Sequence, residues 1–163
     1  MPVFLELERE RELPIVTQNT KRFIDKYIHT CRINKLKEIS DLDFDAIVVG
    51  SDQIWRRDYF RRIWKTGMED AYLGFISDKK IKRVAYAVSF GKDIWDYSKR
   101  ETEKCRDLVS LFNAISVRED TAVGLCLNNL GVKVLHVLDP TMLLSCQDYI
   151  NLIPCGDKFL KFR

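Results

Sequence analysis

The sequence predicts an α/β protein with a Rossmann-like parallel β-sheet flanked by helices. Four short runs are rich in apolar residues, and the first of them, over residues 47–49, lacks polar alternation, which is typical of a strand buried on both faces of a parallel sheet. Amphipathic stretches separate the last three runs, and this alternation indicates parallel strands joined by right-handed crossovers, as in a doubly wound sheet. The predicted strands are residues 45–50, 82–88, 114–117 and 132–138.

Amphipathic patterns also predict the main helices. One begins at Asn19, one spans residues 98–113, and one spans 121–129 and is stopped by Gly131. A further short helix is expected after Asn34, which is placed as its cap.

The segment of residues 53–78 is irregular and rich in aromatic side chains. We interpret it as a loop with short helical turns that covers one end of the sheet. Such side chains can stack on a sugar ring, although at this density most aromatic residues belong to a core. They are Trp55, Tyr59, Phe60, Trp64, Tyr72 and Phe75.

The composition is that of one globular domain with a core. The chain has 163 residues, of which 46% are hydrophobic and 31% charged, and its formal net charge is +3. This small excess does not indicate a nucleic-acid partner, which would need a clustered basic face. The densest basic patch, residues 56–62, favours a solvated helix face over an anionic substrate or a membrane surface.

Cysteine and histidine usage indicates no metal site. The five cysteines include no Cys-x-x-Cys pair, so we expect reduced, mostly structural thiols in the cytoplasm. Of the two histidines, His136 lies in an apolar run and is expected to be a packed core residue. No run approaches the ~20 apolar residues of a membrane helix, and the N-terminus lacks the pattern of a secretory signal.

Each predicted strand ends in a polar group of residues. In parallel strands these endings share one edge of the sheet, where ligands of open α/β sheets bind, so we interpret them as the floor of a cleft. Ser51 or Asp52 capping a following helix remains the alternative. Nucleotide-binding glycine motifs are absent from the sequence. The endings are Gly50-Ser51-Asp52-Gln53, Ser89-Phe90-Gly91, Arg118-Glu119 and Asp139-Pro140.

Four motifs in order resemble the polysaccharide pyruvyl transferase family, from about Phe23 to Leu144. They are Asp45-Ala-Ile-Val-Val-Gly-Ser-Asp-Gln-Ile-Trp55, Val84-Ala-Tyr-Ala-Val-Ser-Phe-Gly91, Ile115-Ser-Val-Arg-Glu119 and Leu138-Asp-Pro-Thr-Met-Leu-Leu144. The resemblance implies one lobe of a two-lobe, glycosyltransferase-B-like enzyme. The implied reaction moves a pyruvyl group from phosphoenolpyruvate to sugar hydroxyls as a ketal, with no cofactor.

The resemblance and the chemistry together suggest roles for the strand endings. Arg118 would clamp the anionic donor, with an ion pair to Glu119 or Asp120 as its alternative role. Asp52 would serve as acid or base, or orient an acceptor hydroxyl. Asp139 is interpreted as a turn-former. The expected substrate-binding residues are Ser51, Gln53, Ser89, Gly91 and Glu119, although Glu119 can also simply start a helix.

The chain also departs from the family pattern. The opening Asn-Tyr-Gly type loop has no counterpart, Arg56 stands where Asn is common, and a second lobe is missing after Leu144. We therefore expect a charged segment (1–18), a pyruvyl-transferase lobe (19–145), and a truncated tail or inter-lobe linker (146–163), inactive alone.

Partners and alternatives follow from the same resemblance. The expected partners are phosphoenolpyruvate and a glycan or lipid-linked sugar acceptor, met in the cytoplasm or by peripheral association with the inner membrane face, and no nucleic acid. A non-catalytic truncated binding module and a nucleotide-sugar glycosyltransferase lobe remain as alternatives, because fold analogy does not decide function.

Overall fold

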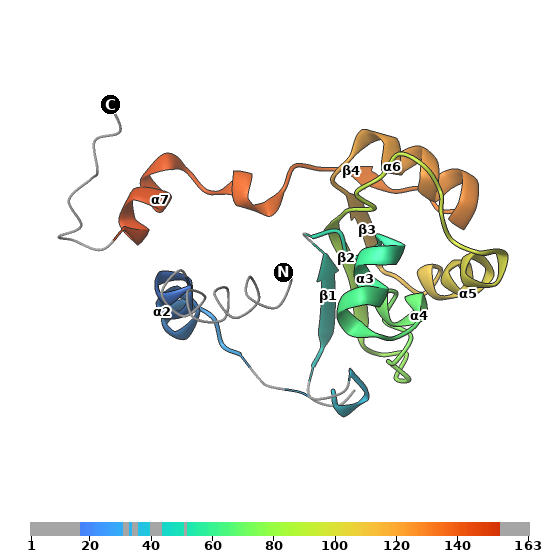
Figure 1. Ribbon diagram of the computed structural model, residues 1–163, viewed down its shortest axis with the longest axis horizontal. Helices are drawn as coiled ribbons and strands as arrows, with labels where there is room; N and C mark the ends of the chain where they lie inside the picture. Colours follow the sequence, from blue (N-terminus) through green and yellow to red (C-terminus); the bar gives the residue numbers. More distant parts are fainter. Residues whose placement is uncertain (1–16, 31–32, 34–35, 40–43, 51, 154–163) are drawn as a thin grey trace, which may run out of the picture. The chain divides into compact units, whose positions relative to one another are not determined.

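A computed structural model describes residues 17–30, 33, 36–39, 44–50 and 52–153 (Figure 1). The chain divides into two compact units, residues 1–38 and 39–163. The first contains helix α2 (Gln18–Tyr27) and the 3-10 turn η1 (Leu36–Glu38). The helix predicted from Asn19 is confirmed. The short helix expected after Asn34 is only the 3-10 turn η1, and Asn34 itself lies outside the described residues.

The second unit is built on a parallel sheet of four strands, which confirms the predicted fold class. In the order β1-β2-β3-β4, the strands are Ala46–Gly50, Lys82–Val88, Ala114–Val117 and Leu135–His136. This order runs in one direction, so the reversal that defines a doubly wound sheet is not found among the described strands.

Strand β4 is shorter than the predicted strand of residues 132–138. The backbone N–H of Val132 bonds to the carbonyl of Cys126 at 3.4 Å, and pairing with β3 begins only at Leu135. Val132 and Val134 instead pack against the core. Their apolar pattern therefore reflects burial without strand pairing.

Helices α3 to α6 lie on one side of the sheet (Figure 1). The segment expected to be a loop with helical turns contains α3 (Arg57–Trp64) and α4 (Met68–Ala71). Next come α5 (Lys99–Val109), shorter than expected, and α6 (Asp120–Leu125), which continues as the π-helical segment η2 (Cys126–Leu130). The described chain ends with the 3-10 turn η3 (Pro140–Leu143) and α7 (Cys146–Leu152).

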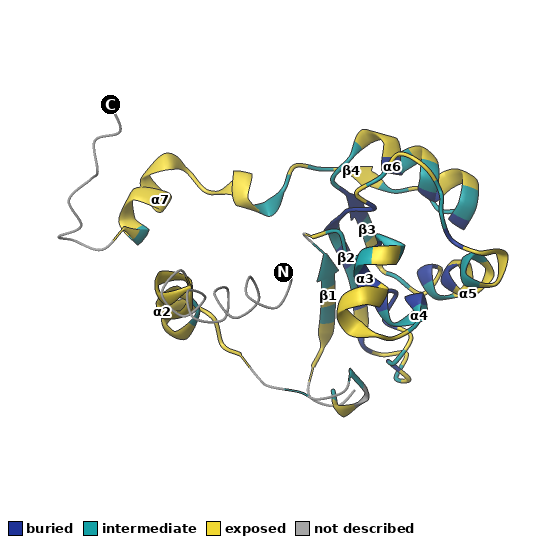
Figure 2. Ribbon diagram, viewed as in Figure 1, coloured by how far each residue is buried: buried dark blue, intermediate teal, exposed yellow. Residues whose placement is uncertain are grey.

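The core lies between these helices and the sheet, and the residues coloured as buried in Figure 2 lie on these elements. Aromatic residues of the 53–78 segment form much of it: Trp55 stacks on Tyr72 with ring centroids 4.5 Å apart. The indole N–H of Trp55 donates to the Ala71 carbonyl, and the Tyr97 hydroxyl donates to the Trp55 carbonyl. Burial raises the pKa of both tyrosines well above the ordinary value. Trp55 therefore fixes the loop that follows β1.

Candidate functional site

The loop after β1 is held against the end of β2. The backbone N–H of Ser89 donates to the Asp52 carbonyl, and the N–H of Trp55 donates to the Ser89 carbonyl, each at 3.2 Å. The Asp52 carboxylate is exposed and accepts hydrogen bonds from the backbone N–H of Gln53 and the Tyr59 hydroxyl. An exposed carboxylate is thus held at the carboxyl edge of the sheet.

Gln53 faces the loop after β2. Its side-chain oxygen accepts a hydrogen bond of 2.7 Å from Nη1 of Arg56. A Cβ atom at Gly91, where φ is +60°, would lie 2.7 Å from the side-chain oxygen of Gln53. Glycine is therefore favoured at position 91 by its left-handed backbone, whereas the Gln53 side chain could shift to admit a Cβ atom. Ser51 lies outside the described residues.

Ser89 connects the ends of β2 and β3. Its side chain is fully buried, and its hydroxyl donates to Oε1 of Glu119 at 2.6 Å while accepting from the backbone N–H of Gly91 at 2.9 Å. The second carboxylate oxygen of Glu119, Oε2, is buried and has no hydrogen-bond partner within the described part of the chain. A buried acceptor without a partner is costly, so this oxygen is a position where a water molecule or a ligand group could donate a hydrogen bond.

Arg118 contacts two carboxylates. Its Nη1 lies 2.7 Å from Oδ2 of Asp139, and its Nε lies 3.5 Å from Oε1 of Glu119. About a quarter of the Arg118 side chain is exposed, at 27%, so an anion can reach the guanidinium. The guanidinium therefore already has two carboxylate partners. One of them, Glu119, is a partner expected if Arg118 served as a structural ion pair and not as a donor clamp.

Asp139 forms the predicted turn and also belongs to the site. It caps η3 by accepting hydrogen bonds from the backbone N–H and hydroxyl of Thr141. The Thr141 N–H, together with the Arg118 guanidinium, lowers the pKa of Asp139 to about 2. Asp139 in turn raises the pKa of Arg118. The pair stays ionised over the physiological range.

His136 is exposed, so the expectation of a packed core residue was wrong. It ends β4, and its ring Nε2 lies 3.1 Å from the carbonyl oxygen of Arg118. A carbonyl only accepts, so this contact needs the proton on Nε2, which leaves Nδ1 as the acceptor of the neutral ring. Apolar neighbours concealed His136, but its position before Asp139, at a strand's carboxyl end, could have revealed it.

The predicted site residues therefore gather along one edge. Arg118, Glu119 and Ser89 are joined by side-chain contacts that extend to Asp139. Asp52 reaches this group through the backbone of Ser89, and no described side-chain bond joins its carboxylate to Arg118. The structure thus presents two carboxylate centres linked by the end of β2.

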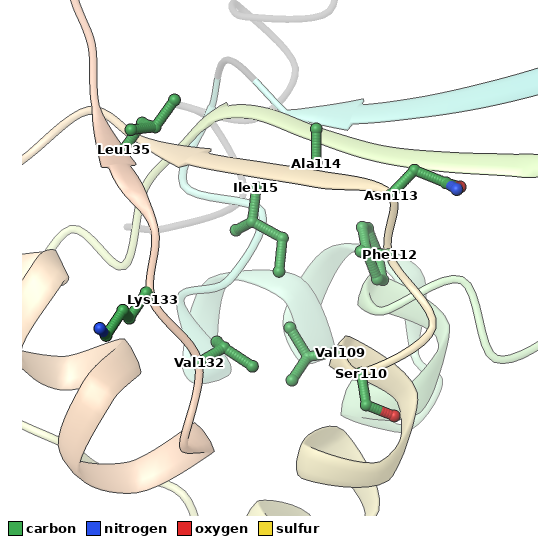
Figure 3. Close-up of a pocket in the computed structure, with 9 residues that line it drawn as sticks. All are labelled: Val109, Ser110, Phe112, Asn113, Ala114, Ile115, Val132, Lys133 and Leu135. Atoms are coloured by element: carbon green, nitrogen blue, oxygen red, sulfur yellow. The ribbon is translucent and has the colours of Figure 1, made fainter.

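A pocket of about 460 Å³ lies elsewhere, between the end of α5, the start of β3 and the segment leading into β4 (Figure 3). Two of its polar side chains have structural bonds: Asn113 accepts from the Arg83 N–H, and Ser110 donates to the Asp107 carbonyl. This pocket adjoins the amino ends of the strands and is separate from the candidate site.

Neither a metal-binding group nor a membrane-spanning helix is found among the described residues. They contain no group of three or more His, Cys, Asp or Glu side chains that could hold a metal ion. Within the same part of the chain, every helix is too short or too polar to cross a membrane.

Arginines of the basic patch form ion pairs, and two of the cysteines are buried in the core. Arg57 and Arg61 contact Glu101 of α5 at 2.9 and 3.5 Å, as suits a helix surface. Cys105 and Cys126 are buried free thiols, and burial raises the pKa of each to about 12. Both thiols are therefore protonated and unreactive.

A parallel sheet with an arginine, hydroxyl groups and carboxylates at its carboxyl edge defines an α/β protein whose polar residues gather where open sheets of this class bind their ligands. Comparison with protein families agrees with this class. The polysaccharide pyruvyl transferase family model matches residues 7–160, so the chain belongs to that family. Neither the curated proteins nor the solved structures yielded a match.

Proposed function

We propose that this chain is one lobe of an enzyme that transfers a pyruvyl group from phosphoenolpyruvate to hydroxyls of a surface glycan, forming a ketal. Family membership supports pyruvyl transfer at the family level. The observation that carries the donor assignment is the partly exposed guanidinium of Arg118 at the end of β3. Phosphoenolpyruvate bears a carboxylate and a phosphate, and arginine binds both groups through paired hydrogen bonds.

The reaction defines what the site must do. A proton adds to the methylene carbon of the enol, which becomes a methyl group, and the neighbouring carbon gains oxocarbenium character. One sugar hydroxyl attacks that carbon and loses its proton, and a second hydroxyl replaces the phosphate. The products are the ketal and inorganic phosphate, with no oxidant or reductant consumed.

Asp52 and Arg118 have different roles in this reaction. Arg118 binds the donor anion, exchanging part of its contact with Asp139 and Glu119 for phosphate or carboxylate oxygens. Asp52, exposed and oriented by Tyr59, moves the proton or orients the acceptor hydroxyl. The acceptor meets the polar groups around Asp52 and the end of β2, which are Ser51, Gln53, Gly91 and Glu119. Ser89, which is fully buried, contributes to the acceptor site indirectly by holding Glu119 and Gly91 in place.

His136 is a second group able to move a proton at this edge. Its Nε2 is bonded to the backbone carbonyl of Arg118, the residue whose guanidinium is the proposed donor clamp. With Nε2 protonated, Nδ1 can accept a proton from an attacking hydroxyl.

The acceptor is a glycan or a lipid-linked sugar, and we place the reaction in the cytoplasm at the inner membrane face. In this proposal residues 19–145 are one lobe of a two-lobe enzyme, whose second lobe completes the cleft.

A direct assay tests the proposal. The full-length protein is incubated with phosphoenolpyruvate and methyl glycosides of galactose, glucose and mannose, each with free diols. Phosphate release that depends on the glycoside, together with a new ketal methyl signal by NMR, is the expected result. Phosphate release without a glycoside adduct would contradict transfer.

A non-catalytic binding module is the second candidate. It is favoured by the carboxylates that already pair with Arg118. Calorimetric titration separates the two, because a binding module takes up phosphoenolpyruvate or a sugar without turnover. Titration with a nucleotide sugar tests the glycosyltransferase alternative, for which tighter binding than phosphoenolpyruvate would be required.

A further inference from the structure

Strand β2 contains one extra residue just before the candidate site. Ala85 of β2 pairs with Ile115 of β3, and Val88 pairs with Val117. Two residues of β2 therefore lie between these pairs where β3 has one. This is a β-bulge. Within it Ala87, which is fully buried, has a φ of 50°, a left-handed conformation that is unfavourable for a residue with a Cβ atom. Something must stabilise this backbone.

Both neighbouring strands are adapted to the bulge. From β3, the buried Ser116 hydroxyl accepts the N–H of Ala87 at 3.0 Å and contacts the Ala85 carbonyl at 3.3 Å. It thereby replaces ladder bonds that the extra residue breaks. From β1, Gly50 faces Tyr86, and a side chain there would overlap the Tyr86 carbonyl oxygen.

The bulge determines how the end of β2 meets the site. One inserted residue shifts the side-chain alternation of everything after it. Beyond it, the Val88 carbonyl accepts the N–H of Arg118 at 3.1 Å, and the Ser89 hydroxyl reaches Glu119. Bulges beside active sites commonly re-aim a side chain, and strained backbone gathers at such places.

We propose that Ser116 is a positioning residue of the candidate site, whose hydroxyl holds the β2 bulge so that Ser89 points at Glu119. The effect on transfer rests on the proposed function, whereas the effect on the loop after β2 does not. Ser116 touches no ligand and acts through Ser89.

The first test reads the loop directly by NMR amide hydrogen exchange. Ser116→Ala should speed exchange at Gly91, whose N–H donates to the Ser89 hydroxyl, and leave the amides of α5 unchanged. Adding Ala87→Gly should slow exchange at Gly91 again, because glycine adopts a φ of +50° without strain and the bulge then needs less support from Ser116. Unchanged exchange at Gly91, or failure of this rescue, would overturn the proposal.

The matched control removes another hydroxyl. Ser98 caps α5 by accepting the Glu101 N–H, away from the bulge. Ser98→Ala should speed exchange at the start of α5 and leave Gly91 unchanged. Faster exchange at Gly91 in this variant would mean that the loop responds to any loss of stability, and the assignment to Ser116 would fail.

The second test is a double-mutant cycle on transfer from phosphoenolpyruvate. Ser116→Ala alone should reduce the rate on the order of tenfold to a hundredfold, as misplacing a site group does. In a Ser89→Ala background it should cost little more, because the same group is lost. Equal losses in both backgrounds would overturn action through Ser89. If wild-type protein shows no transfer, the proposed function fails, and hydrogen exchange alone decides the role of Ser116.

Discussion

The Ser89 hydroxyl donates to Glu119 Oε1 at 2.6 Å, and this bond joins the end of β2 to the first turn of α6. Ser89→Ala removes this short bond from the partly buried Glu119 carboxylate, which keeps a longer contact of 3.5 Å with Nε of Arg118, so we expect a loss of roughly 1–3 kcal/mol in the free energy of unfolding. Urea denaturation measures it. Ser110→Ala, which removes an exposed hydroxyl bonded to the Asp107 carbonyl, is the control and should cost within about 0.5 kcal/mol. Equal losses would contradict a special role for the Ser89 bond.

Arg118→Ala should abolish binding of phosphoenolpyruvate and leave the fold intact. Its ion pairs are partly exposed, and such pairs contribute at most about 1 kcal/mol. Calorimetric titration and thermal unfolding measure the two effects. Arg57→Ala, which removes a similarly exposed ion pair with Glu101, is the control and should retain both the fold and the binding of phosphoenolpyruvate. Full affinity in Arg118→Ala would exclude the clamp.

His136→Gln tests proton transfer at the end of β4. Glutamine can still donate a hydrogen bond toward the Arg118 carbonyl but cannot take up a proton. If the imidazole moves a proton, the transfer rate should fall by about 10²–10⁴-fold, with phosphoenolpyruvate affinity retained. Transfer kinetics and titration check both parts. His29→Gln, the other histidine, should transfer at the wild-type rate, and a similar rate in His136→Gln would assign the ring a structural role only.

The sequence predicted the edge of the sheet that gathers the polar residues, because parallel strands place their carboxyl ends together. It could not predict how those residues pair. The Ser89–Glu119 contact follows a bulge at Ala87, and an alanine in a β-branched run carries no sign of a left-handed backbone. Gly50 was visible as a strand ending, but its reason, the approach of Tyr86, exists only in three dimensions.

Two misjudged features have a common cause. Val132 and Val134 look like strand residues because they are apolar, yet they pack against the core without pairing to β3. His136 looked buried for the same reason, although it lies at an exposed strand end. A run of hydrophobic residues indicates that the segment contacts the core. It does not indicate which backbone groups bond to one another, or whether a polar residue within the run is itself buried.

Glu101 predicts a pH dependence of stability. Although burial favours its neutral form, hydrogen bonds from Ser98 and Arg57 outweigh this and lower its pKa from 4.5 to about 2. Because the folded pKa is depressed, the stabilisation is present above the unfolded value and lost as pH falls from about 5 toward 2. Thermal unfolding should therefore show Glu101→Gln less stable than wild type at pH 7, with the difference vanishing near pH 2. A constant difference across this range would contradict the assignment.

Gly50 and Gly124 form a matched pair for testing the packing of β1 against β2. At Gly50 an added Cβ would overlap the Tyr86 carbonyl, and the backbone φ of 152° disfavours any side chain. Gly50→Ala should therefore lower the free energy of unfolding by roughly 2–4 kcal/mol. Gly124 lies in α6, where an added methyl group would meet open space, so Gly124→Ala should raise the free energy of unfolding by about 0.5–1 kcal/mol.

Urea denaturation of both variants gives the comparison. The same substitution should act in opposite directions, because one methyl group meets a backbone oxygen and the other meets solvent on a helix. Since Gly50 also faces the bulge that precedes Ser89, Gly50→Ala should speed amide exchange at Gly91 as well, whereas Gly124→Ala should not. A Gly50→Ala protein as stable as wild type would show that β1 and β2 do not approach as closely as the bulge requires.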